Sequence, residues 1–440
     1  MLLYNVRIAL KSLRRNPGLT AILIGGIALG ICASTTFTTV RHMFTRDPLP
    51  GKSQYTYYVR LDNWDKDRAY PTAGRVNRLA LPPQITYRDG IELMKSKIPH
   101  HQTLAYRAGI VVYPDRSVGR PYNEVVRLCT SDFFMMFDIP LAYGHPWDRT
   151  ADAKEEQVAI IDDATNNKLF HGGNSVGKRI RINERDFVVV GVVAPWHPFV
   201  KMYEPTGGPT NAPDAIYAPF STGIRMQLPN NGEDDTPGYS VFTSKYEEML
   251  TTERDWIQLW VDLRSPGEVA AYQRYVDSYV LEQKKHGRFP RPLNNSVMDL
   301  RSLLADAGFV QPQLHAMAAI SILFLIICAL NLTGMLLGKF LARSPEVSVR
   351  RALGASRANI FLQHIVECEV VGIAGGAIGM LLSIGVLHFM AKLINTGAAI
   401  TLDAEMIASA AFLSLVAGLT AGLYPAWRIC SVQPAVQLKI

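Results

Sequence analysis

Four long apolar runs dominate the hydropathy pattern of this 440-residue chain. The first is Leu19–Val40, and the other three all follow residue 316. These later runs are Met317–Leu337, Val370–Met390 and Ala404–Leu423. A membrane helix needs about 20 mainly apolar residues to cross the hydrocarbon core. A buried helix of a soluble protein usually keeps a polar face, which these runs lack. The pattern therefore predicts four transmembrane helices, 19–43 (with a short stalk), 317–337, 366–390 and 404–423.

Residues 1–18 have a different, amphipathic pattern. At helical spacing the apolar side chains share one face, made of Leu3, Val6, Leu10 and Leu13. The basic side chains share another face, made of Arg7, Lys11 and Arg14. The segment is predicted to be an amphipathic helix on the inner membrane surface. The alternative is a charged segment that only sets the topology.

Residues 44–316 have the polarity of a water-soluble domain with a mixed α/β fold. Strand patterns occur at 55–61, 103–113, 158–162, 178–182, 187–193 and 256–263. Helices are predicted at 82–97 and 266–285. The strand-rich section of about 120–220 lies between strand–helix units, which predicts two lobes, one inserted into the other. The stretch 200–250 is predicted to form loops that are solvated or contact a partner.

The charges indicate how the runs cross the membrane. The section from Arg41 to Ala316 has 33 basic and 33 acidic residues, so the net charge of +7 comes from elsewhere. The excess of bases flanks the apolar runs, in residues 1–18, 338–365 and 424–440, whereas 391–403 is not basic. Because basic flanks mark the cytoplasmic side, both termini are predicted inside and 44–316 outside. A neutral soluble section also argues against nucleic acid as a partner.

The sequence offers little for catalysis. The closest phosphate-binding loop, Gly51-Lys52-Ser53, has Arg46 where that motif requires glycine. Neither G-x-S-x-G nor H-E-x-x-H occurs, and Cys129 is the only cysteine of the external section. We therefore expect no catalytic residue, no cofactor and no metal site, and any ATP hydrolysis in a separate subunit. The runs also lack interior ionisable groups, which favours a mechanical element over an ion-coupled pump.

Glycine pairs at i, i+4 spacing recur in the apolar runs. They are Gly26 and Gly30, Gly372 and Gly376, Gly375 and Gly379, and Gly418 and Gly422. Such pairs let helix backbones approach closely, so we expect tight helix packing. Four helices with several such pairs also favour a second membrane subunit, identical or different.

The loop 338–365 is the most distinctive of the inner segments. Glu346, Arg350 and Arg351 are available to grip a partner, Gly354 permits a sharp turn, and Ser356 can cap the next helix. Alternatively, the loop is a solvated elbow whose arginines only set topology.

This loop resembles a known family. Its residues 346–356 (EVSVRRALGAS), with Gln363, Glu367 and the glycines that follow, are similar to the loop and third span of FtsX-like/MacB-like ABC permeases. Residues 9–17 (ALKSLRRNP) resemble that family's start, and 422–428 (GLYPAWR) its end. Weaker likenesses to the family's periplasmic core domain occur in the external section.

The resemblance implies a subunit of a type VII ABC transporter in the bacterial inner membrane, without a fused ATPase. In that family two permeases join two cytoplasmic ABC ATPase subunits, and the external domain has porter-like and sabre-like lobes. The resemblance assigns the ATPase contact to Glu346, Val349, Arg350, Arg351, Leu353, Gly354 and Ser356. A periplasmic adaptor, an outer-membrane duct and membrane lipid are further partners that it implies.

The leading hypothesis is a permease that transmits ATP-driven motion to its periplasmic domain for efflux or for lipoprotein or peptide export. One alternative is a transmembrane regulator or sensor that acts on periplasmic partners such as wall hydrolases. Another is a membrane-anchored scaffold without energy input.

Overall fold

The computed structural model divides into two compact units. Residues 1–46 and 310–440 form the first, here called the helical unit, and 47–309 form the second, here called the sheet unit. The structure describes residues 2–72, 75–77, 80–114, 119–196, 198, 200–204, 213–238, 240, 245–308, 312–394 and 403–431.

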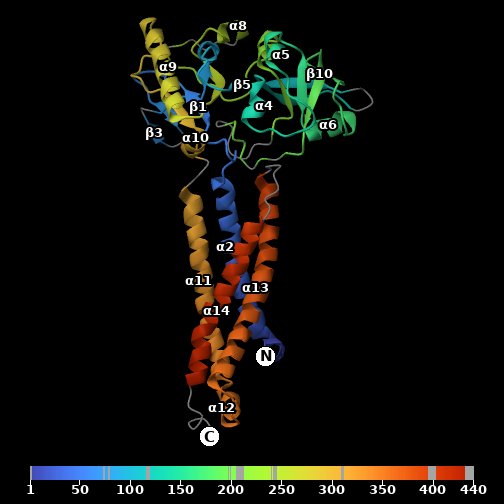
Figure 1. Ribbon diagram of the computed structural model, residues 1–440, viewed down its shortest axis with the longest axis vertical. Helices are drawn as coiled ribbons and strands as arrows, with labels where there is room; N and C mark the ends of the chain where they lie inside the picture. The colour runs from blue at the N-terminus through green and yellow to red at the C-terminus, as the bar shows by residue number, and fades with distance from the viewer. Residues whose placement is uncertain are drawn as a thin grey trace. The chain divides into compact units, whose positions relative to one another are not determined.

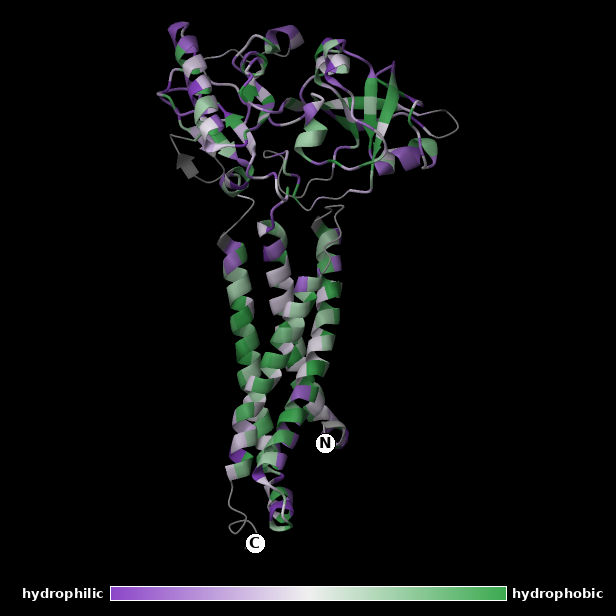
Figure 2. Ribbon diagram, in the orientation of Figure 1, coloured by the Kyte–Doolittle hydropathy of each residue, from purple (hydrophilic) through white to green (hydrophobic). Residues whose placement is uncertain are grey.

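The helical unit contains four helices that are long and apolar enough to cross a membrane, which confirms the predicted spans (Figures 1 and 2). They are α2 (Pro17–Thr45), α11 (Pro312–Leu341), α13 (Arg357–Ile394) and α14 (Ala404–Ser431). The described part of this unit also contains two shorter helices, α1 (Leu2–Arg15) and α12 (Ser344–Ala352). The long helices pack side by side, and each extends past the apolar run that predicted it.

Glycines lie at close contacts between these helices. A Cβ added to Gly372 of α13 would lie 3.1 Å from the Cα of Gly418 on α14. One added to Gly376 would lie 2.1 Å from the Ser414 hydroxyl oxygen, which donates to the Gly372 carbonyl at 2.7 Å. Further along the same contact, a Cβ on Gly422 would lie 2.6 Å from that of Cys368. Side chains at these positions would push α13 and α14 apart.

The other glycines divide by position. Gly375 and Gly379 of α13 lie against α2, and Gly30 of α2 lies against Leu325 of α11. At Gly26, no described atom would come within 4 Å of an added Cβ. The close glycine contacts therefore join helices of one chain, so the spacing that suggested a second subunit is already used within this bundle.

Within its described residues, the sheet unit contains one large sheet and one small sheet. Its strands are β1 (Thr56–Arg60), β2 (Tyr70–Thr72), β3 (Arg75–Asn77), β4 (Ile85–Thr86), β5 (Gln102–Tyr113), β6 (Tyr122–Cys129), β7 (Leu141–Gly144), β8 (Val158–Ile161), β9 (Arg179–Ile182), β10 (Arg185–Val193), β11 (Ile216–Pro219), β12 (Asp255–Asp262) and β13 (Ser296–Asp299). Its helices are α3 (Tyr87–Leu93), α4 (Asp132–Met136), α5 (Arg149–Ala153), α6 (Asp163–Phe170), α7 (Phe220–Arg225), α8 (Tyr246–Met249), α9 (Pro266–Lys285) and α10 (Leu300–Asp306).

The strand order is β13-β1-β12-β5-β6-β11-β8-β10-β7, with β4 paired to β12 and β9 paired to β5 and β10. A separate small sheet contains β2 and β3. The first residues of β5 pair with β12, while most of its length pairs with β6. The strands of the middle section therefore occupy one end of the sheet and those of the flanking sections the other, with β5 joining the two ends.

Helices cover both faces of this sheet. Tyr272 and Val276 of α9 pack on one face, and Phe133 of α4 and Leu300 of α10 belong to the core on the other. Strand β12 is buried on both sides, which explains its nearly continuous apolar sequence.

Most of the predicted elements are present, and one helix is shorter than expected. Helix α9 has the predicted bounds, with the Ser265 hydroxyl accepting from the Glu268 amide at 3.2 Å. The helix expected at 82–97 covers only Tyr87–Leu93. The preceding Ile85 and Thr86 pair with β12 instead, and Thr86 then caps α3.

The expectation of loops in 200–250 is wrong for much of that stretch. Residues 205–212, 239 and 241–244 of it lie outside the described residues. Within the described part, β11 and α7 form, and Lys201, Glu204 and Asp214 are buried. The carboxylates of Glu204 and Asp214 face the buried Arg127 of β6, whose Nε donates to Asp214 at 2.9 Å, and Lys201 also pairs with Asp214. The sequence predicted a solvated loop because the carboxylates are polar. The local sequence does not show that a distant arginine neutralises them.

A second buried acid, Asp255, gives a prediction about pH. The Asn63 amide donates to one carboxylate oxygen of Asp255 at 2.8 Å, while the other is buried without a hydrogen bond among the described residues. Burial raises the pKa of Asp255 well above its ordinary value, and Asp89, Asp235 and Glu253 raise it further. When a carboxyl group has a raised pKa in the folded state, the folded protein loses stability as the pH rises above about 3.9, which is the pKa of that group in the unfolded chain.

We therefore expect Asp255→Asn to stabilise the full-length protein by about 1 kcal/mol at pH 7.5. The gain should shrink as the pH falls toward 4, because the carboxyl group is then protonated in the folded state and about half protonated in the unfolded state. Thermal unfolding in detergent at the two pH values measures this, with the exposed Asp67→Asn as the matched control. A loss of stability at pH 7.5 would contradict the expectation.

Candidate functional site

The loop between the second and third apolar runs is more ordered than an elbow, because most of it is helical. Helix α12 begins with Pro345 in its first turn, where the missing amide hydrogen costs nothing. Glu346 lies in that first turn and Arg350 in the last, an arrangement that the helix dipole favours. The predicted polar elbow is thus a short helix followed by a tight turn.

The turn after α12 places the next helix. Gly354 has φ +98°, a backbone conformation that is strained for residues with a Cβ atom. Glycine therefore suits this position. The Ser356 hydroxyl accepts from the Asn359 amide at 3.2 Å, which is the cap expected from the sequence. Helix α13 therefore begins at Arg357, nine residues before the start predicted for the third span.

The charged residues assigned to the ATPase contact are engaged within the chain. Arg350 donates to Glu346 at 2.6 Å, one helical turn away, and lies 3.4 Å from the Gln363 amide oxygen of α13. Arg15 of α1 lies 3.9 Å from Glu346. On the other side, Arg351 donates to the Cys430 carbonyl of α14 at 3.4 Å. These side chains connect α12 to its neighbours.

The apolar residues of the same set face outward. Leu353 is 83% exposed and Val349 is 47% exposed, and they lie one turn apart at the end of α12. We call these two residues the α12 knob. Contiguous exposed apolar surface is typical of contacts with other proteins, so these two side chains are the part of the set that is open to a partner.

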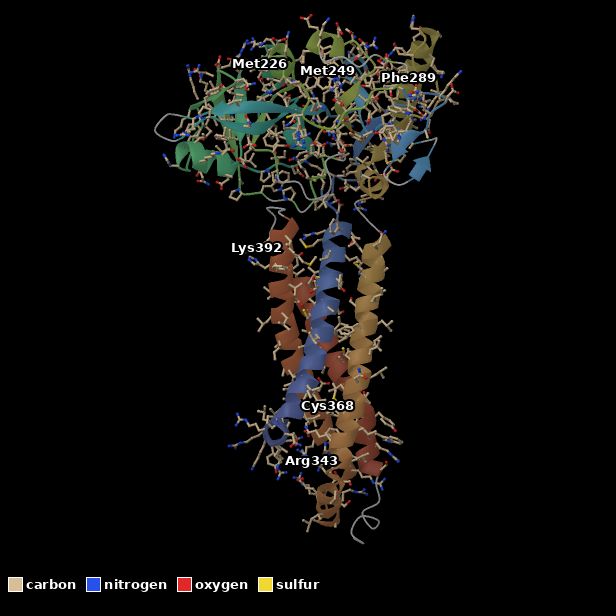
Figure 3. The ribbon with its side chains drawn as sticks, turned by 180° about the vertical axis from the view of Figure 1, so that it is seen from behind. Met226, Met249, Phe289, Arg343, Cys368 and Lys392 are labelled. Atoms are coloured by element: carbon tan, nitrogen blue, oxygen red, sulfur yellow. The ribbon has the colours of Figure 1, made fainter. Side chains whose placement is uncertain are left out.

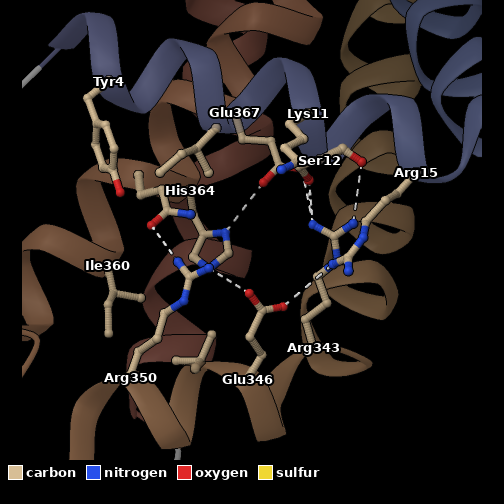
Figure 4. Close-up of a pocket in the computed structure, with 13 residues that line it drawn as sticks. Tyr4, Lys11, Ser12, Arg15, Arg343, Glu346, Arg350, Ile360, His364 and Glu367 are labelled. Atoms are coloured by element: carbon tan, nitrogen blue, oxygen red, sulfur yellow. Dashed lines mark hydrogen bonds and ion pairs between the residues drawn. The ribbon is translucent and has the colours of Figure 1, made fainter. Parts of the chain in front are cut away.

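A buried polar cluster lies behind α12. Lys339 of α11 and Glu367 of α13 form an ion pair at 2.6 Å, and both side chains are 2% exposed. The Ser12 hydroxyl of α1 donates to Glu367, and Arg343 donates to the same hydroxyl. His364 Nδ1 lies 3.8 Å from Glu367. We call Ser12, Lys339, Arg343, His364 and Glu367 the Glu367 cluster, and Figure 4 shows all of it except Lys339.

Sequence reasoning did not find this cluster. In the sequence, Glu367 is one of the residues that carry the family resemblance of the third span, and Lys339 is one base among several flanking charges. The only signal was that opposite charges flank consecutive spans, which does not show that the two side chains meet.

The buried face of α1 also differs from the predicted apolar face. Ala9, Ser12 and Leu13 are buried, whereas Leu10 is 49% exposed. The side chain of Leu3 lies outside the described residues. The helix therefore turns a mixed face to the bundle, because Ser12 gains the Glu367 carboxylate as a partner.

A cavity of about 400 Å³ opens between α1, α12 and α13 (Figure 4). Its lining includes the basic side chains of Lys11, Arg15, Arg343 and Arg350 and the carboxylates of Glu346 and Glu367. Figure 3 places Arg343 toward one end of the helical unit and Lys392 toward the other. The cavity thus lies at the end where α2 and α13 begin and α11 ends. Elsewhere among the described residues, no group of three His, Cys, Asp or Glu side chains is arranged to hold a metal.

Comparison with known proteins covers nearly all of the chain. Residues 20–279 match the family model described as the MacB-like periplasmic core domain. Residues 318–434 match the model described as the FtsX-like permease C-terminal. The second match contains α12, the α12 knob and all of the Glu367 cluster except Ser12.

Curated relatives include proteins named macrolide export ATP-binding/permease protein MacB. The one from Syntrophobacter fumaroxidans is 26% identical over 344 residues, covering 70% of this chain and 46% of the relative. The one from Chromobacterium violaceum is 23% identical over 437 residues, covering 97% of this chain and 59% of the relative. The chain spans about half the length of the curated relatives it matches.

Among solved structures, the periplasmic region of MacB from Actinobacillus actinomycetemcomitans is similar, with a TM-score of 0.37 and 14% identity. That match covers 58% of this chain and 94% of the other.

Proposed function

Because the chain belongs to the MacB-like and FtsX-like family of ABC transporter permeases, we propose that it transmits the motion of ATPase subunits across the membrane. ATP is hydrolysed by a partner that docks on the α12 knob. The work is done by the sheet unit on the far side of the membrane, in efflux or in export of a lipoprotein or peptide. The protein needs no cofactor of its own for this role.

The observation that carries the proposal is the exposure of Val349 and Leu353 on a helix that is tied to the bundle. Helix α12 joins α1 through Arg15 and Glu346, α13 through Arg350 and Gln363, and α14 through Arg351. A push on the α12 knob therefore moves several helices together. An isolated flexible loop would dissipate the same motion.

The orientation follows from the charges. Bases flank the end of the bundle that holds α1, α12 and the end of α14, so this end faces the cytoplasm, where ATPases reside. Both termini are then cytoplasmic, and the protein is a multi-pass component of the bacterial inner membrane. A second permease, identical or different, completes the complex.

The test uses the double variant Val349→Glu with Leu353→Glu, co-expressed with the candidate ATPase. We expect the ATPase to co-purify at least tenfold less well, because charged side chains in an apolar contact remain desolvated and unpaired. Stimulation of ATP hydrolysis by the permease should fall in parallel.

A matched control places the same change on exposed leucines of the sheet unit, as Leu281→Glu with Leu293→Glu. This control should retain full association. If the α12 variant recovered the ATPase and stimulated hydrolysis like the wild type, the α12 knob would not be the coupling contact. If no ATPase associated with the wild-type protein, this result would favour the alternatives, a transmembrane regulator or a scaffold.

A further inference from the structure

The cavity behind α12 has more positive charge than its carboxylates neutralise. Glu346 is paired by Arg350 at 2.6 Å, and Glu367 is paired by Lys339 at 2.6 Å. With both acids satisfied by these partners, Lys11, Arg15 and Arg343 supply the surplus. Arg15 and Arg343 each lie 3.9 Å from an already paired carboxylate.

Lys11 is the least engaged of these cations. It lines the cavity from α1, and among the residues that the structure describes, no carboxylate lies within 4.0 Å of its ammonium group. Arg15 follows one turn later on the same helix. Arg343 reaches the cavity from the turn between α11 and α12, where its Nη1 donates to the Ser12 hydroxyl. Three cations from two separate segments thus surround one space.

The remaining lining of the cavity fits an amphiphile. Tyr4 and Ile8 of α1 and Ile360 of α13 contribute apolar surface. The cavity also lies where two spans begin and one ends, which is the level of lipid headgroups in a membrane. Guanidinium and ammonium groups are the side chains that bind phosphate best, through charge-assisted hydrogen bonds.

We propose that this cavity is a phosphate-binding site, in which Lys11, Arg15 and Arg343 hold the anion. Its size of about 400 Å³ suits a headgroup or a small phosphate ester. A phosphate bound there links α1 to the start of α12. The site is independent of whether an ATPase docks on the α12 knob.

The test uses the full-length protein, stripped of lipid in detergent, and native mass spectrometry. We expect phosphatidylglycerol to bind about tenfold more tightly than a diacylglycerol with the same acyl chains. The double variant Lys11→Gln with Arg15→Gln should lose most of this preference. The control Arg7→Gln with Arg14→Gln also removes two positive charges from exposed positions of α1, but these residues do not line the cavity, so it should keep the preference.

Inorganic phosphate in equilibrium dialysis distinguishes the two sources of the anion. Phosphate binding that requires Lys11 and Arg15, without a preference for phosphatidylglycerol, would support the site with a free phosphate as its ligand. Equal losses in both double variants, or no dependence on either ligand, would overturn the proposal.

A measurement on the wild type guards against a variant that folds poorly. Phosphatidylglycerol should slow amide hydrogen exchange in α1 at least fivefold more than diacylglycerol does, because the bound phosphate ties Lys11 and Arg15 to Arg343. If neither phosphatidylglycerol nor inorganic phosphate changed exchange in α1, the site would be refuted.

Discussion

Glu367→Gln is expected to lower the free energy of unfolding of the helical unit by about 3–5 kcal/mol. The substitution keeps the size of the side chain but removes its charge, which leaves the Lys339 ammonium buried without a carboxylate. Removing one partner of a buried pair costs far more than the pair itself contributes, because the remaining charge stays desolvated. The loss would appear as a lower midpoint of thermal or denaturant unfolding in detergent.

Two variants distinguish the loss of the ion pair from a general destabilisation caused by any substitution in α13. Glu369→Gln makes the same change two residues away, where the carboxylate has no ion pair among the described residues and is only partly buried. It should alter stability by less than about 1 kcal/mol. Adding Lys339→Met to Glu367→Gln removes the unpaired ammonium and should restore much of the loss. Equal effects of Glu367→Gln and Glu369→Gln would mean that the Glu367 cluster does not stabilise the bundle.

This cluster also bears on coupling. Ser12, Lys339 and Glu367 belong to α1, α11 and α13, so one buried carboxylate holds three helices at the end where α12 lies. If force enters through the α12 knob, as proposed, the cluster keeps these helices moving together. A milder variant such as Ser12→Ala should therefore weaken the stimulation of ATP hydrolysis more than it weakens ATPase binding.

Arg127→Met is expected to destabilise the sheet unit by about 3–5 kcal/mol. Arg127 is fully buried in β6, donates to Asp214 at 2.9 Å and to Gln258 at 3.1 Å, and pairs with Glu204. After the substitution, Lys201 and the more distant Arg107 are the cations that remain near the Asp214 carboxylate. Amide hydrogen exchange of β6, β11 and β12 in the full-length protein reports the loss.

The effect should depend on pH. Burial raises the pKa of Asp214, but Arg127 and Lys201 more than offset this and hold the pKa below its ordinary value. A lowered pKa in the folded state gives stability that is present above the unfolded value of about 3.9 and is lost as the pH falls through the folded value. The difference in the free energy of unfolding between wild type and Arg127→Met should therefore become smaller in strong acid.

The neighbouring strand supplies a control for this variant. Arg107 of β5 lies opposite Arg127 in the register and 3.9 Å from the same Asp214 carboxylate, but it is partly exposed. Arg107→Met should cost less than about 1 kcal/mol, because Asp214 keeps both of its closer partners. Similar losses for the two arginines would contradict the special role of Arg127.

The sequence alone determined the elements whose signals are local. Each apolar run is long enough to cross the hydrocarbon core, so four membrane helices followed directly from composition. Helix α9 was predicted with its bounds because a proline begins it, and the turn after α12 was predicted from Gly354 and Ser356. The family resemblance, which the comparisons bear out, rests on short stretches of the same kind.

Only the tertiary structure decided which distant side chains meet. Ser12 and Glu367 are 355 positions apart, and Arg127 and Asp214 are 87 positions apart, so no local pattern shows that they are partners. The same holds for Gly26 and Gly30, which share one motif although, of the two, an added Cβ would meet another helix among the described residues at Gly30 and not at Gly26. A buried charge is stable only beside its counter-charge, and a glycine matters only where another backbone approaches, so both depend on how the whole chain packs.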